Sequence, residues 1–188
     1  DQFVKGHIPQ SIFIGIDGDF APWVGVLLRN VSQPILLITP SGREKEAVTR
    51  LARVGFDNTL GYLKGGIESW VKAGKHIDIV QRVTANKLKK EIKKENLAIF
   101  DVRKSSEFIS EHIPYAENTP LDLIDKHMCD FPSQNPFYIH CAGGYRSVIA
   151  ASILKSKGFH NLIDVDGGFT KIKENGIEIS KNISPIKL

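Results

Sequence analysis

The sequence predicts an α/β protein made of two related domains, each a mainly parallel sheet flanked by helices. Short apolar, β-prone runs alternate with helix-like segments, which is typical of a parallel sheet covered by helices on its faces. Most of this pattern occurs twice along the 188 residues. The length fits two domains of about 100 residues each.

Single residues and short strings of the first part recur in the second in the same order and at an almost constant distance. The paired positions are Phe3 and Phe108, His7-Ile8-Pro9 and His112-Ile113-Pro114, Arg43 and Arg146, Leu51 and Leu154, Gly55 and Gly158, and Gly65-Gly66 and Gly167-Gly168. Small changes in this distance indicate loop insertions between two homologous domains. We therefore expect domains over residues 1–80 and 81–188, with the boundary near residues 80–83.

The second copy contains every element of an alternating α/β pattern. The expected helices cover residues 84–94, 105–109, 121–126 and 146–157, and the expected strands cover residues 97–101, 137–140 and 162–165. Thr84 is a predicted N-cap and Gly158 a predicted C′ glycine. In the first copy a strand is expected over residues 35–38, but the opening helix and first central strand would fall before residue 1. We expect the first domain to be truncated there, so that the chain is a fragment or another element covers the exposed sheet edge.

The octapeptide HCAGGYRS, residues 140–147, joins a predicted strand to a predicted helix. Cys141 lies at the end of the strand, and glycines let the loop turn sharply. Successive loop N–H groups can point inward as an anion-binding nest, and a helix N-terminus adds about half a positive charge. The same field stabilises a thiolate, so a nucleophilic Cys141 in a cradle for anions is the predicted chemistry. The predicted cradle consists of Ala142, Gly143, Gly144, Tyr145, Arg146 and Ser147.

Three of these residues have alternative roles on the sequence alone. Arg146 either attracts an anionic donor or orders the loop through hydrogen bonds to carbonyl groups, and the matching Arg43 favours a partly structural role. Ser147 either donates to the sulfur or caps the helix. Tyr145 either flanks the mouth of the pocket or shields the loop.

Residues near the loop are expected to support it without taking part in the chemistry. Asp101 and Arg103 are expected to pair across the strand end and brace the loop, and His140 to pack within the sheet. Cys129 has no comparable setting, so we expect an ordinary packed or surface thiol.

Composition narrows the class of protein. The net charge of +4 is spread along the chain, which suits small anionic substrates and gives little support to nucleic-acid binding. No apolar stretch approaches the length of a membrane span, and the first residues do not resemble a signal peptide. Two cysteines make no disulfide framework, which fits a reducing, cytoplasmic location. The six histidines show no metal spacing, so we expect neither a metal nor an organic cofactor.

From Leu97 onward the second copy resembles the rhodanese family of sulfurtransferases. The resemblance is carried by Asp101-Val102-Arg103, Glu107-Phe108, His112-Ile113-Pro114, the Cys141 loop and Asp166-Gly167-Gly168. The first copy resembles the inactive domain of tandem rhodaneses, because a gap-free alignment puts Ile38 at the cysteine position and its loop ITPSGR has no thiol. The strings GHIPQS and DGDFAPWVG also resemble tandem rhodaneses fused behind a metallo-β-lactamase-type persulfide dioxygenase, which would place such a domain upstream.

The resemblance implies a two-step sulfur transfer. The Cys141 thiolate would take a sulfur from thiosulfate or a low-molecular-weight persulfide, hold it as a persulfide, and pass it to a thiol or cyanide. One alternative is a non-catalytic sulfur carrier or docking module of a larger enzyme. Another is a Cdc25-type phosphatase or arsenate reductase, since these share the fold, but their loop has one residue more than the six from Cys141 to Arg146.

Overall fold

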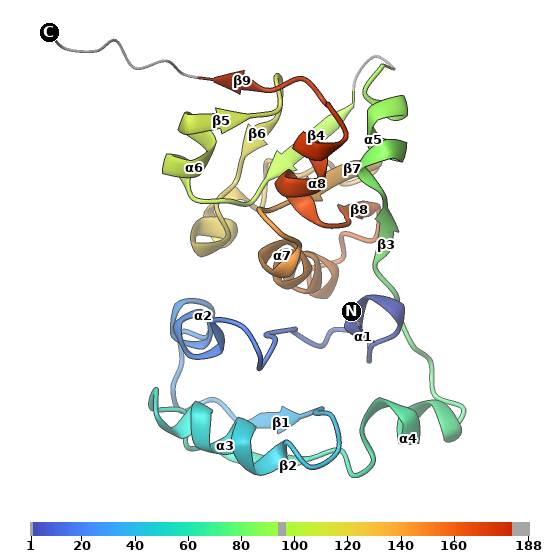
Figure 1. Cartoon of the computed structure of the whole chain (residues 1–188). Coiled ribbons are helices and arrows are strands. Elements are labelled where there is room, and N and C mark those ends of the chain that lie inside the picture. Colours follow the sequence, from blue (N-terminus) through green and yellow to red (C-terminus); the bar gives the residue numbers. More distant parts are fainter. Residues whose placement is uncertain (1, 94–96, 182–188) are drawn as a thin grey trace, which may run out of the picture. The chain divides into compact units, whose positions relative to one another are not determined.

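The chain forms two compact units, Asp1–Ile79 and Val80–Leu188, in a computed structural model that describes residues 2–93 and 97–181 (Figure 1). Both units mix helices with parallel strands, so the α/β prediction is confirmed. Within the described ranges, no helix is both long enough and apolar enough to cross a membrane.

The first unit is built around two parallel strands. Its elements are α1 (Gln2–Lys5), α2 (Phe20–Leu27), β1 (Ile35–Leu37), α3 (Glu44–Ala52), β2 (Thr59–Tyr62) and α4 (Gly66–Lys72). One face of the β1–β2 sheet packs on α2 and α3 through a cluster that includes Phe20, Leu51 and Phe56. Side chains alternate along a strand, and those on the opposite face, Leu36 and Leu60, are 75% and 65% exposed.

The second unit contains a five-stranded sheet. Its elements are β3 (Gln81–Val83), α5 (Ala85–Glu91), β4 (Ala98–Asp101), α6 (Ser105–Ser110), β5 (Glu111–His112), β6 (Glu117–Asn118), η1 (Leu121–His127), β7 (Phe137–His140), α7 (Tyr145–Ser156), β8 (Leu162–Val165), α8 (Gly168–Glu174) and β9 (Ser180–Lys181). The strand order is β3-β8-β7-β4-β6, and every pairing in this sheet is parallel. A separate antiparallel pair joins β5 to β9.

Both faces of the five-stranded sheet are covered. On one face Ile99, Tyr138 and Val165 belong to a cluster with Leu88 of α5 and Phe169 of α8. The next residues along the strands point to the other face, where the rings of Phe100 and Phe137 lie 5.5 Å apart beside those of Phe131 and Phe159. This two-sided burial explains why the three inner strands of the sheet, β4, β7 and β8, consist mainly of apolar residues.

Most local predictions for the second unit are confirmed. Strands β7 and β8 have the predicted bounds. The Thr84 hydroxyl accepts a hydrogen bond from the Lys87 N–H at 3.3 Å, as an N-cap does. Gly158 follows α7 with a φ of +96°, as expected of a C′ glycine. Lys94, the predicted end of the first helix, lies outside the described residues.

The structure also contains elements that the sequence analysis did not predict. Residues 81–83, next to the predicted boundary, form the strand β3 beside β8. A strand of three residues with one buried side chain is too short to show an alternating pattern. The predicted helical turn near residue 121 is the 3₁₀-helix η1, and the short strands β5, β6 and β9 were not expected.

Candidate active site

Cys141 follows the last residue of β7, the middle strand of the five-stranded sheet. In the neighbouring strand β4, Asp101 pairs in register with His140. After β7 the chain passes through α7 to β8, which is the neighbour of β7 on the side away from β4. After β4 the chain continues to β6, which is the neighbour of β4 on the side away from β7. In parallel sheets the carboxyl ends of two strands with diverging connections form the usual ligand-binding crevice. The topology therefore places Cys141 where such a site is expected.

The loop after β7 brings one N–H group and one hydroxyl group next to the sulfur. The Gly144 N–H donates to Cys141 Sγ at 3.1 Å, and the Cys141 thiol donates to the Ser147 hydroxyl oxygen at 3.6 Å. Gly144 has a φ of +101°, a conformation that favours glycine. The twelve-residue helix α7 begins at the next residue, so its positive end adjoins the loop. Cys141 itself is buried, with only 1% of its surface exposed.

Helix α8 holds the backbone of the loop from the other side. The Phe169 N–H donates to the Cys141 carbonyl at 2.7 Å, and the Thr170 N–H donates to the Ala142 carbonyl at 3.0 Å. Gly168 permits this close approach, since a Cβ at that position would lie 2.3 Å from the Cys141 carbonyl oxygen. The carbonyl groups of Cys141 and Ala142 thus bind α8, whereas the Gly144 N–H on the same loop binds the sulfur.

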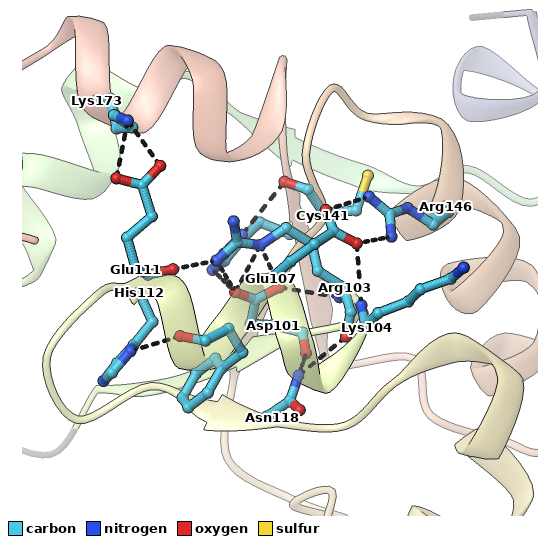
Figure 2. A network of polar contacts seen from close by, with 12 residues as sticks. Asp101, Arg103, Lys104, Glu107, Glu111, His112, Asn118, Cys141, Arg146 and Lys173 are labelled. Atoms are coloured by element: carbon cyan, nitrogen blue, oxygen red, sulfur yellow. Dashed lines mark hydrogen bonds and ion pairs between the residues drawn. The ribbon is translucent and has the colours of Figure 1, made fainter. Parts of the chain in front are cut away.

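Arg146 has a partner that the sequence analysis did not foresee. Its Nη1 and Nη2 donate to the two oxygens of Glu107 at 2.5 and 2.9 Å (Figure 2). The hydrogen bond from Arg146 is the main reason that the pKa of Glu107 is lowered, and the same bond raises the pKa of Arg146. Neither of the two roles considered for Arg146, attraction of an anionic donor or hydrogen bonding to loop carbonyls, included this ion pair. Glu107 also accepts from the Lys104 N–H at 3.2 Å, so it joins the start of α6 to the start of α7.

Asp101 and Arg103 form the buried pair that the sequence suggested. Arg103 Nε and Nη2 donate to Asp101 at 2.6 to 3.0 Å, and both residues are almost fully buried (Figure 2). The guanidinium also donates to the Glu111 carbonyl at 2.7 Å and lies 3.7 Å from the centre of the Phe169 ring. The guanidinium therefore packs on the residue whose N–H binds the Cys141 carbonyl.

The remaining predicted residues occupy varied positions. Ala142, Gly144 and Tyr145 are half-buried, and Gly143 is exposed. His140 is fully buried in the sheet as expected, and this burial lowers its pKa. Cys129 is an exposed thiol.

The sequence analysis gave no role to Glu107 or Gly168. Glu107 and Arg146 are 39 residues apart in the sequence, so no local sequence pattern predicts that they pair. The repeated double glycine did mark Gly167-Gly168 as a sharp turn, but only the structure shows what the turn approaches.

The first unit has a matching loop without a thiol. A Cβ on Gly66 would lie 3.1 Å from the Thr39 carbonyl oxygen, which repeats the approach of Gly168 to Cys141. Thr39, and not Ile38, therefore takes the place of Cys141. The gap-free alignment assumed loops of equal length, whereas the loop from Thr39 to Arg43 is one residue shorter than its counterpart.

Among the residues that the structure describes, no group of three or more His, Cys, Asp or Glu side chains is arranged to hold a metal ion.

Comparison with known proteins identifies the family. The Rhodanese-like domain family matches residues 1–73 and again residues 84–175. The chain therefore belongs to the rhodanese-like domain family, with two such domains in tandem.

Individual relatives agree with this assignment. The chain is 34% identical over 98 residues to the thiosulfate sulfurtransferase GlpE of Pseudoalteromonas translucida, a match that covers 52% of this chain and 88% of that protein. It is 37% identical over 75 residues to the adenylyltransferase and sulfurtransferase uba4 of Ogataea parapolymorpha, covering 39% of this chain but only 19% of that protein. The rhodanese-like domain of Alr3790 from Anabaena is 24% identical, covers 58% of this chain and 88% of that domain, and superimposes with a TM-score of 0.51, which supports the fold.

Proposed function

We propose that the second unit transfers a sulfane sulfur that it carries as a persulfide on Cys141. The observation that carries this proposal is the Gly144 N–H, 3.1 Å from Sγ at the junction of β7 and α7. An N–H in this position and the positive end of a helix stabilise an anionic sulfur before and after it receives the transferred atom.

The proposed reaction has two steps. In the first, the Cys141 thiolate attacks the outer sulfur of thiosulfate, the sulfur–sulfur bond breaks, and sulfite leaves with the bonding electrons. In the second, an acceptor nucleophile attacks the outer sulfur of the persulfide, and Cys141 leaves as a thiolate. With cyanide the product is thiocyanate, and with a thiol it is a new persulfide. No external oxidant or reductant is needed.

The contacts of Arg146 favour sulfur transfer over phosphate chemistry. A phosphatase loop uses its arginine to grip phosphate oxygens, whereas both terminal nitrogens of Arg146 here donate to Glu107. The loop also contains no acidic residue to protonate a leaving alcohol, and it has six residues from Cys141 to Arg146. A short loop around a buried thiol suits a single sulfur atom better than a tetrahedral group.

The proposal also covers the molecule that donates the sulfur and the enzyme that shares its supply. Thiosulfate and a low-molecular-weight persulfide are the two donors we propose, with a thiol as the acceptor in the cell. The resemblance of GHIPQS and DGDFAPWVG to dioxygenase-fused rhodaneses favours the persulfide. A persulfide dioxygenase, in the same natural chain or as a partner in the cytoplasm, would then act on the same pool of sulfane sulfur.

Steady-state turnover tests the proposal against its two rivals. Thiocyanate formation from thiosulfate and cyanide should continue over many turnovers, disappear in Cys141→Ser, and persist in Cys129→Ser, the matched control at the exposed thiol. A non-catalytic carrier would be charged once and then stall. Hydrolysis of an aryl phosphate that depends on Cys141, without thiocyanate formation, would instead establish the phosphatase alternative.

A further inference from the structure

Two residues that contact Cys141 lie on either side of Arg146 in the chain. The Gly144 N–H donates to Sγ at 3.1 Å, and the Ser147 hydroxyl oxygen accepts from the thiol at 3.6 Å. The Arg146 guanidinium, however, donates to both oxygens of Glu107, at 2.5 and 2.9 Å. Glu107 has no part in the two-step reaction above, so its bond to an arginine this close to the nucleophile needs a separate explanation.

The ion pair between Glu107 and Arg146 is largely shielded from water. The Arg146 side chain is 18% exposed and that of Glu107 is 34% exposed. Glu107 has a second hydrogen bond that holds it in place, since its Oε2 accepts from the Lys104 N–H at the start of α6. A contact of a guanidinium with both oxygens of a carboxylate is among the stronger hydrogen-bonded pairs. We therefore expect the pair to persist in the resting site, with a net charge of zero.

Other cations around the site add little positive charge. Arg103 is buried and donates to both oxygens of Asp101. Lys173 binds both oxygens of Glu111 at 2.7 and 2.9 Å. Lys104 is exposed, where water and salt screen its charge. An incoming donor therefore meets a backbone N–H and the partial positive charge at the start of α7 in place of a full cationic charge.

The charge of a donor decides how strongly such a neutral site disfavours it. Thiosulfate carries two negative charges, so its approach to the Cys141 thiolate brings three negative charges together. The S–SH group of a protonated low-molecular-weight persulfide carries none. Repulsion between charges a few ångströms apart is stronger in a partly buried site than in water. A free Arg146 would offset this repulsion for thiosulfate far more than for the persulfide.

We propose that Glu107 determines donor specificity by neutralising Arg146, so that the site favours a persulfide over thiosulfate; this inference rests on the proposed role of Cys141 in sulfur transfer. With the persulfide, Cys141 Sγ attacks the outer sulfur, the bond between the two sulfurs of the donor breaks, and the donor thiolate leaves with the bonding electrons. The proton of the S–SH group stays on the transferred sulfur, so the total charge is unchanged. Glu107 acts on the donor through Arg146 and touches no reacting atom.

Two alkylating reagents of similar size measure the charge around the sulfur without any sulfur donor. Iodoacetamide is neutral and iodoacetate carries one negative charge, and their rates at Cys141 are compared by mass spectrometry in a Cys129→Ser background. Glu107→Gln frees the charge of Arg146 and keeps an oxygen that can accept from the Lys104 N–H. It should raise the ratio of the iodoacetate rate to the iodoacetamide rate about fivefold, as expected of one charge a few ångströms away.

Three further variants separate the charge from the structure. Arg146→Gln leaves Glu107 without its partner and should lower the same ratio about fivefold. The double variant Glu107→Gln/Arg146→Gln is again neutral and should return to within about twofold of the parent. Glu111→Gln is the matched control, because it removes the same charge from a carboxylate that binds Lys173 with both oxygens. It should leave the ratio within about twofold of the parent.

Two sulfur donors repeat the comparison in the reaction itself. Methanethiosulfonate has a methyl group where thiosulfate has a charged oxygen, so it carries one negative charge less. In both donors the outer sulfur is attacked, and methanesulfinate or sulfite leaves with the bonding electrons. Glu107→Gln should raise kcat/KM for thiosulfate relative to methanethiosulfonate about fivefold, the same factor as for the alkylating reagents.

Several results would overturn this role of Glu107. A folded Glu107→Gln that changes all rates equally would show that Glu107 merely joins α6 to α7. If Glu107→Gln did not fold, an unchanged ratio in Arg146→Gln would have the same meaning. A predicted change in the alkylation ratio without sulfur transfer from either donor would support the neutralisation of Arg146 and refute the proposed function, so the two failures are distinguishable.

Discussion

Replacing Gly168 by alanine should displace the loop that holds Cys141. The new Cβ would lie 2.3 Å from the Cys141 carbonyl oxygen and 2.9 Å from that of Ala142. The backbone therefore has to move by about 1 Å to restore ordinary van der Waals contact, a misplacement large enough to affect catalysis. The φ of +54° adds a strain of about 1–2 kcal/mol for a residue with a side chain. Loss of the hydrogen bond from the Phe169 N–H to the loop adds about 0.5–1.5 kcal/mol. We expect the free energy of unfolding to fall by about 1.5–3.5 kcal/mol in total. Sulfur transfer should fall about 100-fold, as for a misplacement near 1 Å.

Gly176→Ala separates the strain from the displacement of the loop. Gly176 has a similar φ of +65°, but a Cβ there would meet only Lys89 Nζ at 3.5 Å. Urea denaturation and thiocyanate formation are measured on both variants. The control should lose about 1–2 kcal/mol of stability and keep its activity once folded. Equal activity in folded Gly168→Ala and Gly176→Ala would refute the idea that α8 shapes the active-site loop.

Three further predictions concern the polar groups around the site. Arg103→Met should lower the free energy of unfolding by about 3–5 kcal/mol in urea denaturation, because it leaves Asp101 buried without its counter-charge, and an unchanged midpoint would contradict this. The lowered pKa of Glu107 gives stability above about pH 4.5 that disappears as the pH falls through its folded-state pKa. Glu107→Gln should therefore lose less free energy of unfolding than the parent when the pH is lowered through this range. Parallel curves of stability against pH for variant and parent would argue against it. Burial lowers the pKa of His140, so stability should fall by about 1.4 kcal/mol per pH unit below about pH 6.5 until the folded-state pKa is reached. His140→Gln should remove that slope, and thermal melts of the two proteins across this range are the measurement.

The local parts of the site could be predicted from the sequence. A strand, a glycine loop and a helix follow one another within residues 137–157, so neighbouring residues alone define where Cys141 lies. The internal repeat gave independent evidence for a loop at the same place in the domain. It also identified Gly167-Gly168 as a sharp turn. These signals depend on short-range backbone preferences, which a sequence displays directly.

Contacts between distant segments could not be predicted in this way. The pairing of Glu107 with Arg146 depends on how α6 packs beside α7, and the strand β3 is defined only by its pairing with β8. Thr39 replaced Ile38 as the counterpart of Cys141 because a difference of one residue in a loop is invisible until the backbone contacts are known.

The most direct test of the central claim is to locate the transferred sulfur by mass spectrometry. The chain is incubated with thiosulfate or a low-molecular-weight persulfide, digested, and compared with Cys141→Ser and Cys129→Ser before and after cyanide. We predict one added sulfur atom on the peptide that contains Cys141, absent from Cys141→Ser, retained in Cys129→Ser and released by cyanide. A folded chain that gains no sulfur from either donor, or gains it on Cys129, would contradict the account.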